Sequence, residues 1–413
     1  MTQSCRGRKR ARVSQSVSES LDSASKMMKN RTEESTKGIY TSKLKMLIEY
    51  FKEKHPNCLN ETQDEIIVPI PDKNAITSFF GMLCQAALTL KEMKVEDITE
   101  DTIIPLSHSA IAGHKSALKD LYADKKCVFD EDLDRNLEII LESYKKTIAT
   151  LKQEGKMKAS EGKSPFTFDA YVEMARTFMK TIPSVCGGTW STTLFAWPFF
   201  LLCWNLMSRS ASVGSIMLNH FGWNGDALTI REHKHKGDQA GENTYDKHIY
   251  ANPFKPEICP ILSLAVLIFS TNRPENGSQQ LFPGQNNNKR FSDILRKVVK
   301  SIADAILNTL GIVPSEIGCH STRKGSPTYC LGQVCGPSPV SVFLRMGHSL
   351  GQLKDRYIFE GDGSDQLCGR MVTIYLFLFI VNPQFVFSST RLAVYRFAPS
   401  SLQFYRPIFD LKY

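Results

Sequence analysis

The sequence predicts a mainly α-helical protein with a small β-hairpin or sheet, divided into a helical N-terminal domain and an α+β C-terminal domain. Three observations lead to this fold class. Apolar residues recur at helical spacing through residues 38–153, a polar Lys/Gly-rich stretch interrupts the pattern at Gln153–Ser164, and two strand-like segments flank a Gly-rich turn further on. A length of 413 residues also favours two or three domains, at about 150 residues each.

The composition is that of an ordinary soluble protein, with 42% hydrophobic and 23% charged residues. The formal net charge of +9 favours an acidic partner such as nucleic acid, although many soluble proteins are this basic. The 11 cysteines are odd in number and form no Cys-x-x-Cys pair. This pattern indicates reduced thiols in a reducing compartment rather than a disulfide framework or a zinc site. No signal peptide is visible, because the basic N-terminus lacks an apolar segment.

Residues 1–36 are predicted to form a disordered basic tail, because they are rich in Ser, Thr, Lys and Arg and have few large apolar groups. Within this tail, Arg6–Arg12 carries five cations in seven positions. We interpret this run as a nuclear localisation segment that also contacts DNA phosphates, which predicts a nuclear protein. The alternative is a solvated basic tail without a specific role.

Residues 37–153 form the predicted helical domain. Its first helix carries an apolar stripe at Tyr40, Leu44, Leu47 and Phe51 and stops before Pro56. Three further helices are predicted at 75–93, 109–122 and 133–151. By itself the pattern fits an ordinary four-helix bundle with a solvated Lys-rich face. Residues 154–164 are predicted to be the linker to the next domain.

The predicted C-terminal domain spans residues 165–372. Pro165 opens a helix, and Trp190–Met207 is apolar enough to be a buried core helix, although Pro198 and Asn205 interrupt it. Arg209 is expected to end this helix. A cation beside such an apolar segment needs a partner, because burying it alone is costly. It is either a phosphate ligand or an arginine that reaches out to the surface.

Two strands are predicted at 227–232 and 244–251, around the Gly-rich turn that begins at Lys236. This places Lys236 at a hairpin tip, with Lys234 as its rival. His233 and His235 stand two residues apart, but with no third ligand nearby a metal site is not expected. A short helix at 261–269, a loop at 271–288 and an amphipathic helix at 291–310 follow.

A short span further on carries two imidazoles, a guanidinium and a phenol, at His320, Arg323, His348 and Tyr357. His320 and Arg323 share one face if their segment is helical. No carboxylate pair and no group of metal ligands accompanies them in the sequence. This set is typical of a phosphate-handling site in which arginine holds the anion, histidine moves protons and tyrosine attacks.

The order of these groups resembles the signature of tyrosine recombinases, closest to the eukaryotic crypton-type members. The resemblance covers about residues 38–373 and rests on the segments Asn205–Ser210, Lys236–Gln239, His320–Gly325, Gly347–His348 and Asp355–Tyr357. It implies a core-binding (SAM-like) helical domain that clamps double-stranded DNA, followed by the catalytic domain. It also implies a homotetramer, a dimer of dimers, on synapsed DNA, with no cofactor, metal or ATP. The implied catalytic residues are Arg209, Lys236, His320, Arg323, His348 and Tyr357.

In the implied reaction Tyr357 attacks a DNA phosphodiester and forms a 3′-phosphotyrosyl link. A phenol with a pKa of about 10 must lose its proton in the transition state, and His320 is the candidate acceptor. The two arginines would brace the non-bridging oxygens, His348 would add a hydrogen bond and Lys236 would protonate the leaving 5′-oxygen. Each residue also has an ordinary structural alternative, since histidines often cap helices and most of the 13 tyrosines must be structural.

Two other functions remain open at this point. A domesticated descendant could keep the fold and bind DNA without catalysis, and a type IB topoisomerase shares the tyrosine chemistry. Residues 373–413 match the family poorly and are treated as a divergent C-terminal tail. The apolar run at 372–381 is too short to span a bilayer, so no membrane association is expected.

Overall fold

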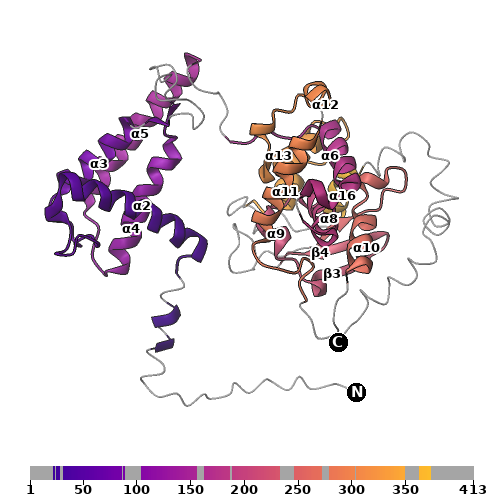
Figure 1. The fold of residues 1–413 in the computed structure, drawn as a ribbon, viewed down its shortest axis with the longest axis horizontal. Coiled ribbons are helices and arrows are strands. Elements are labelled where there is room, and N and C mark those ends of the chain that lie inside the picture. Colours follow the sequence, from indigo (N-terminus) through magenta and orange to yellow (C-terminus); the bar gives the residue numbers. More distant parts are fainter. Residues whose placement is uncertain are drawn as a thin grey trace. The chain divides into compact units, whose positions relative to one another are not determined.

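A computed structural model shows two compact units, Met1–Glu161 (unit 1) and Gly162–Tyr413 (unit 2). The structure describes residues 22–23, 25–27, 31–85, 87–88, 104–155, 162–186, 188–232, 246–271, 279–302, 304–348 and 362–373. Figure 1 draws these residues as ribbons, and each unit is described by itself.

Unit 1 is a helical unit with its own apolar core. Two of its helices begin with a side-chain cap, since the side chain of Ser107 accepts from the amide of Ala110 and that of Asp130 from the amide of Leu133. Buried aromatic and aliphatic residues, among them Phe51 and Phe79, fill the centre. Its elements are α2 (Glu34–Lys54), η1 (Pro56–Cys58), α3 (Lys73–Gln85), β1 (Ala87–Leu88), β2 (Ile104–Pro105), α4 (His108–Asp124) and α5 (Glu131–Gln153).

The helix predicted at 75–93 was wrong at its C-terminal end. Helix α3 stops at Gln85, and the short strand β1 that follows pairs antiparallel with β2. The apolar run after Gln85 satisfies helical spacing and strand spacing equally well. Pairing with a distant segment therefore overrides the local pattern.

Unit 2 is built around helix α8 (Trp190–Asn205), which contacts seven other helices of the described residues (Figure 1). Almost every side chain of α8 from Phe195 onward is buried, so the apolar segment is a core helix as predicted. The other helices are α6 (Phe168–Lys180), α7 (Pro183–Cys186), α9 (Ser210–Gly214), η4 (Leu218–His220), η5 (Pro256–Ile258), α10 (Pro260–Ser270), α11 (Asn287–Ser301), α12 (Asp304–Thr309), η6 (Pro314–Glu316), α13 (Cys319–Leu331), α14 (Pro339–Arg345) and α16 (Asp362–Val372).

A small antiparallel sheet completes unit 2, in the order β3 (Phe221–Asn224), β4 (Ala227–Arg231), β5 (Asp246–Ile249). In its register Phe221 lies opposite Ile230, and Ile230 lies opposite Lys247. The fold is thus mainly helical with a small sheet, and the predicted fold class is confirmed.

Three details of unit 2 differ from the sequence prediction. Strand β3 was not predicted, although the two residues of the turn that joins it to β4, Gly225 and Asp226, are a hairpin signal. The helix predicted at 291–310 is divided into α11 and α12, because the backbone is extended at Ile302. Helix α8 ends at Asn205 rather than at Arg209, which instead precedes α9 as its N-cap residue.

Several predicted features lie outside the described residues. They include the basic run at 6–12, the turn with Lys234 and Lys236, the pair His233 and His235, the residue Tyr357 and the tail from 374 onward. Among the helices that the structure does describe, none combines the length and the apolar character needed to cross a bilayer.

Candidate functional site at the end of helix α8

The C-terminal end of α8 is surrounded by cations from three other elements. A helix leaves its last carbonyls without intrahelical partners, and its dipole makes this end negative. Here those carbonyls accept from side chains far away in sequence. Arg345 Nη2 donates to the oxygen of Asn205 at 2.8 Å, Lys247 Nζ to that of Leu206 at 3.2 Å and Arg323 Nη1 to that of Met207 at 2.6 Å.

The turn after α8 delivers Arg209. Met207 has φ +52°, a left-handed conformation that is uncommon for a residue with a side chain. Ser208 is buried, and the half-buried Arg209 then opens α9 by accepting the amide of Val213. No hydrogen bond or ion pair joins the Arg209 guanidinium to another described residue. Of the two predicted alternatives, a phosphate ligand or an arginine that reaches the surface, neither is excluded by this placement.

Arg323 links the segments that precede Arg209 and His348. It is 7% exposed, and its second terminal nitrogen, Nη2, donates to the carbonyl of Met346 at 2.6 Å. Its helix, α13, lies close to α8 because Gly325 has no side chain. A Cβ atom at Gly325 would stand 2.9 Å from the ring of Trp204 on α8 and 2.3 Å from the carbonyl oxygen of Phe166, which precedes α6.

His348 is placed by the end of α14. Gly347 has φ +68° and its amide donates to Leu344, while the amide of His348 donates to Phe343. This pair of bonds is a Schellman motif, in which glycine takes the left-handed position. The His348 ring stacks on the Phe343 ring, with an angle of 24° between their planes and their centroids 6.1 Å apart. The Gly-His dipeptide of the sequence therefore has a structural reason, since the glycine allows the turn that exposes the imidazole.

Three of the predicted site residues influence one another electrostatically. The pKa of His348 is lowered by partial burial and by the positive charges of Arg323 and Arg209. His320 lies in the first turn of α13, one helical turn before Arg323, and its side chain is exposed. The structure thus brings Arg209, Arg323 and His348 together and puts His320 on the helix that carries Arg323.

Lys236 and Tyr357 cannot be placed, because both lie outside the described residues. The nearest described residues in sequence are Glu232 and Asp246 around Lys236, and His348 and Asp362 around Tyr357. The assignment of these two residues stays a prediction.

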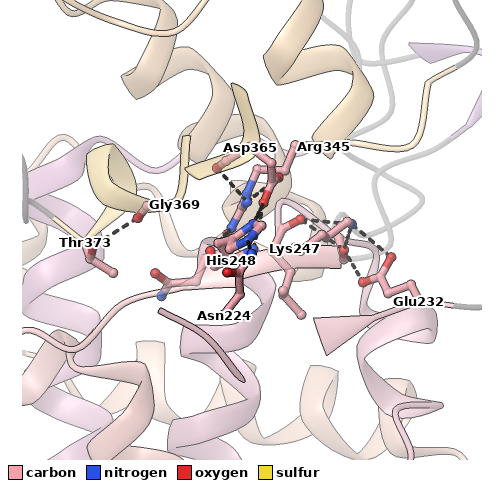
Figure 2. A network of polar contacts seen from close by, with 11 residues as sticks. Asn224, Glu232, Lys247, His248, Arg345, Asp365, Gly369 and Thr373 are labelled. Atoms are coloured by element: carbon pink, nitrogen blue, oxygen red, sulfur yellow. Dashed lines mark hydrogen bonds and ion pairs between the residues drawn. The ribbon is translucent and has the colours of Figure 1, made fainter. Parts of the chain in front are cut away.

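A second polar cluster lies beside the first and was not predicted (Figure 2). Asp365 of α16 pairs with Arg345 and accepts from the amide and Nδ1 of His248, at 2.7 and 2.9 Å. The opposite ring nitrogen of His248, Nε2, lies 3.1 Å from the side-chain nitrogen Nδ2 of Asn224. Burial opposes ionisation of Asp365, but Arg345 and His248 outweigh it, so the pKa of this carboxyl is lowered.

The end of α8 is therefore a region of positive charge. Among the described residues, four cationic side chains, Arg209, Lys247, Arg323 and Arg345, stand against the two carboxylates of Glu232 and Asp365. Arg345 is fully buried, and the carboxylate of Asp365 neutralises its charge. The excess positive charge is therefore carried by the residues near Arg209. Excess positive charge beside the turn that follows α8 is suited to binding an anion such as a phosphodiester.

Sequence reasoning missed Lys247, Glu232, Arg345 and Asp365. One signal was available for Arg345, which stands in the apolar run Val342–Met346 and needed a partner if buried. Lys247 alternates with apolar strand residues and offers a weaker signal of the same kind. Across the described ranges, no cluster of three or more His, Cys, Asp or Glu residues could hold a metal ion.

Comparisons with known proteins find only distant structural similarity. No protein-family model and no curated protein matches the chain. Among solved structures, the chain is similar to XerH site-specific recombinase bound to its difH substrate in a pre-cleavage complex, with 12% identity, a TM-score of 0.44 and 76% of this chain and 73% of that chain covered. It is also similar to FLP recombinase in a Holliday junction complex, with 11% identity, a TM-score of 0.37 and coverage of 80% and 82%. The function proposed below rests on the residues of this chain and not on these values.

Proposed function

We propose that this protein is a site-specific DNA recombinase of the tyrosine type, acting as the transposase of a crypton-like mobile element. The observation that carries the proposal is the meeting of Arg209, Arg323 and His348 at the cation-rich end of α8. These three residues come from sequence segments that each resemble a box of the family. Their joint placement supports a common role on one phosphate.

In the proposed reaction the phenolic oxygen of Tyr357 forms a bond to the scissile phosphorus, and the bond from phosphorus to the 5′-oxygen breaks. His320 takes the phenolic proton, and Lys236 gives a proton to the leaving oxygen. The 3′-phosphotyrosyl link keeps the energy of the broken bond. Attack by a 5′-hydroxyl from another strand then reverses the chemistry and exchanges strands without ATP.

Arg209 and Arg323 stabilise the charge on the non-bridging oxygens during both steps, and His348 adds a hydrogen bond. The lowered pKa of His348 keeps its ring neutral at neutral pH, so it donates through one nitrogen only. Double-stranded DNA is the proposed partner, bound by a homotetramer, and the basic run at 6–12 directs the protein to the nucleus.

One observation favours a second candidate, a DNA-binding protein of the same fold without catalysis. Arg323 already donates from both terminal nitrogens to main-chain carbonyls. A purely structural arginine would make the same bonds. In this alternative the cation-rich end of α8 holds a phosphate but no strand is cut.

A covalent trapping assay decides between the two. Nicked duplexes from a randomised pool are incubated with the full chain in EDTA, and the denaturation-resistant adduct is recovered and sequenced to find the preferred DNA. The recombinase proposal predicts an adduct with the wild type and with the matched control Tyr40→Phe, and none with Tyr357→Phe. DNA retained in a gel shift with no adduct from any of the three proteins would favour the non-catalytic alternative.

A further inference from the structure

Below the turn that delivers Arg209 lies a buried group formed by Ser208, Glu232 and Lys247, each less than 10% exposed. Lys247 Nζ lies 3.0 Å from Glu232 Oε2 and donates to Ser208 Oγ at 2.8 Å. The Ser208 hydroxyl in turn donates to the other carboxylate oxygen of Glu232. The three side chains therefore close a ring of hydrogen bonds, and the Glu232–Lys247 part of it appears in Figure 2.

This ring holds the turn in place. The amine of Lys247 also donates to the carbonyl of Leu206, and Arg323 donates to that of Met207. Because Met207 is held at φ +52°, its conformation persists only where the surroundings fix it. The ring thus forms hydrogen bonds with the residues on both sides of Met207, namely Leu206 and Ser208.

Holding the turn with this ring costs free energy. A buried ion pair loses the hydration of both charges, and an apolar pair of similar volume is often no less stable. Burial lowers the pKa of Lys247, and the carboxylate of Glu232 opposes this shift. Because such a pair adds little stability, we infer that this one serves to fix a specific geometry.

The fixed turn sets the main-chain position of Arg209, which directly follows Ser208. We propose that Glu232 and Lys247 are positioning residues which, through Ser208, set the direction in which Arg209 meets the scissile phosphate. This inference rests on the function proposed above. Neither residue touches the DNA in this account, and both act only through the main chain at Ser208 and Arg209.

The test is Glu232→Gln in the full-length chain, which keeps the size of the side chain and removes its charge. We expect the single-turnover rate of adduct formation on the selected nicked duplex to fall about tenfold to a hundredfold, as for a small misplacement of a catalytic group. Duplex affinity falls by much less. Ser208→Ala changes the rate in the same direction, and Glu232→Asp recovers part of it.

The matched control is Glu257→Gln. Glu257 pairs with Arg176 at 3.1 Å, and their elements, η5 and α6, carry none of the proposed site residues. This control should leave the rate unchanged. A general loss of stability from removing a carboxylate would instead slow both variants.

A double-mutant cycle separates positioning from a purely structural role. If Glu232 acts through Arg209, the effect of Glu232→Gln on the rate disappears in an Arg209→Lys background. An effect of equal size in both backgrounds, or no effect in either, would overturn the inference while leaving the recombinase proposal intact.

The inference can also be judged if no adduct forms at all. The same cycle is then measured as duplex affinity in a gel shift, in the Tyr357→Phe chain. The inference predicts that Glu232→Gln weakens binding only where Arg209 is present. Additive losses, or a parent chain that binds no duplex, contradict it, whereas a missing adduct alone contradicts only the proposed catalysis.

Discussion

The two units bury charge in different ways. In unit 1 the buried cation Lys115 pairs with Asp134 and Glu138, whose side chains stay partly exposed to water. In unit 2 both partners of each central pair are buried, as in Glu232–Lys247 and Asp365–Arg345. The first arrangement costs little because water still reaches the carboxylates, whereas the second must satisfy every polar atom within the protein. The buried charges of unit 2 are thus satisfied within the protein, whereas the carboxylates that pair with Lys115 in unit 1 still contact water.

The two histidines that are buried among the described residues differ in the same way. His114 of unit 1 packs against the Phe79 ring, with centroids 5.4 Å apart, and burial lowers its pKa to about 4. His248 of unit 2 lies between Asp365 and Asn224, both within hydrogen-bond distance. An apolar neighbour favours the neutral ring, while a carboxylate gives the ring a fixed orientation.

The largest expected effect comes from Arg345→Met. It leaves the buried Asp365 without its cation and the Asn205 carbonyl without its donor, so we expect unit 2 to lose about 3–5 kcal/mol. Hydrogen exchange read by mass spectrometry reports each unit separately and should show faster exchange in unit 2 alone. The control Arg296→Met breaks an exposed pair with Asp293 and should cost less than about 1 kcal/mol. Both variants lie in unit 2, so equal losses would contradict the claim that the pair of Arg345 with Asp365 matters because it is buried.

Lowering the pH should reduce the stability of unit 1, because His114 is buried in its neutral form. Its pKa is about 4 in the folded protein and 6.5 for an ordinary histidine, so between these pH values the unfolded chain binds the extra proton. Stability is thus complete above pH 6.5 and is lost as pH falls toward 4, by up to about 3 kcal/mol. Hydrogen exchange in unit 1 followed across this window measures the loss, and His114→Phe should flatten it. An unchanged slope in the variant would refute the assignment.

Asp365 of unit 2 differs from His114 in the pH range over which it affects stability. Its pKa is lowered, so its contribution is lost only at more acidic pH. A carboxyl whose pKa is lowered on folding contributes stability above its unfolded pKa, and this is lost as pH falls through the folded value. Unit 2 should therefore keep the contribution of Asp365 over the whole window in which His114 weakens unit 1.

A pair of glycine substitutions should act in opposite directions in the two units. Gly325→Ala places a Cβ atom 2.3 Å from the Phe166 oxygen and should destabilise unit 2 by about 1–3 kcal/mol while slowing adduct formation. Gly81→Ala in α3 meets nothing within 4 Å and should stabilise unit 1 by about 0.5–1 kcal/mol. Thermal unfolding measures both. A harmless alanine at 325 would show that α13 can move away from α8 freely.

The smallest effect is electrostatic. Removing the charge of Arg209 by Arg209→Gln should raise the pKa of His348 toward its ordinary value, because that charge helps to lower it. An NMR titration of the labelled histidine ring measures the change, with Arg296→Gln as a control on a surface charge. A pKa of His348 that stays the same would place Arg209 outside the site.

The sequence predicted the helices better than the site. Apolar spacing located α4, α5 and α6 closely, and the buried α8 followed from its composition alone. The end of α3 and the break after α11 depend on pairing and packing with distant segments. The local spacing of apolar residues carries no information about these segments. Resemblance singled out Arg209, Arg323 and His348. The partners that hold them, such as the Met207 carbonyl that binds Arg323 from 116 residues away, are set by the fold and leave little local signal.

The most direct measurement identifies the amino acid that becomes attached to DNA. The trapped adduct is digested with protease and nuclease, and mass spectrometry locates the residue that carries the 3′-phosphonucleotide. The account predicts Tyr357, in an adduct whose rate of formation collapses in Arg209→Ala and Arg323→Ala. Attachment at any other residue, or formation that is indifferent to both arginines, would contradict the claim that the cation-rich end of α8 is the site of strand cleavage.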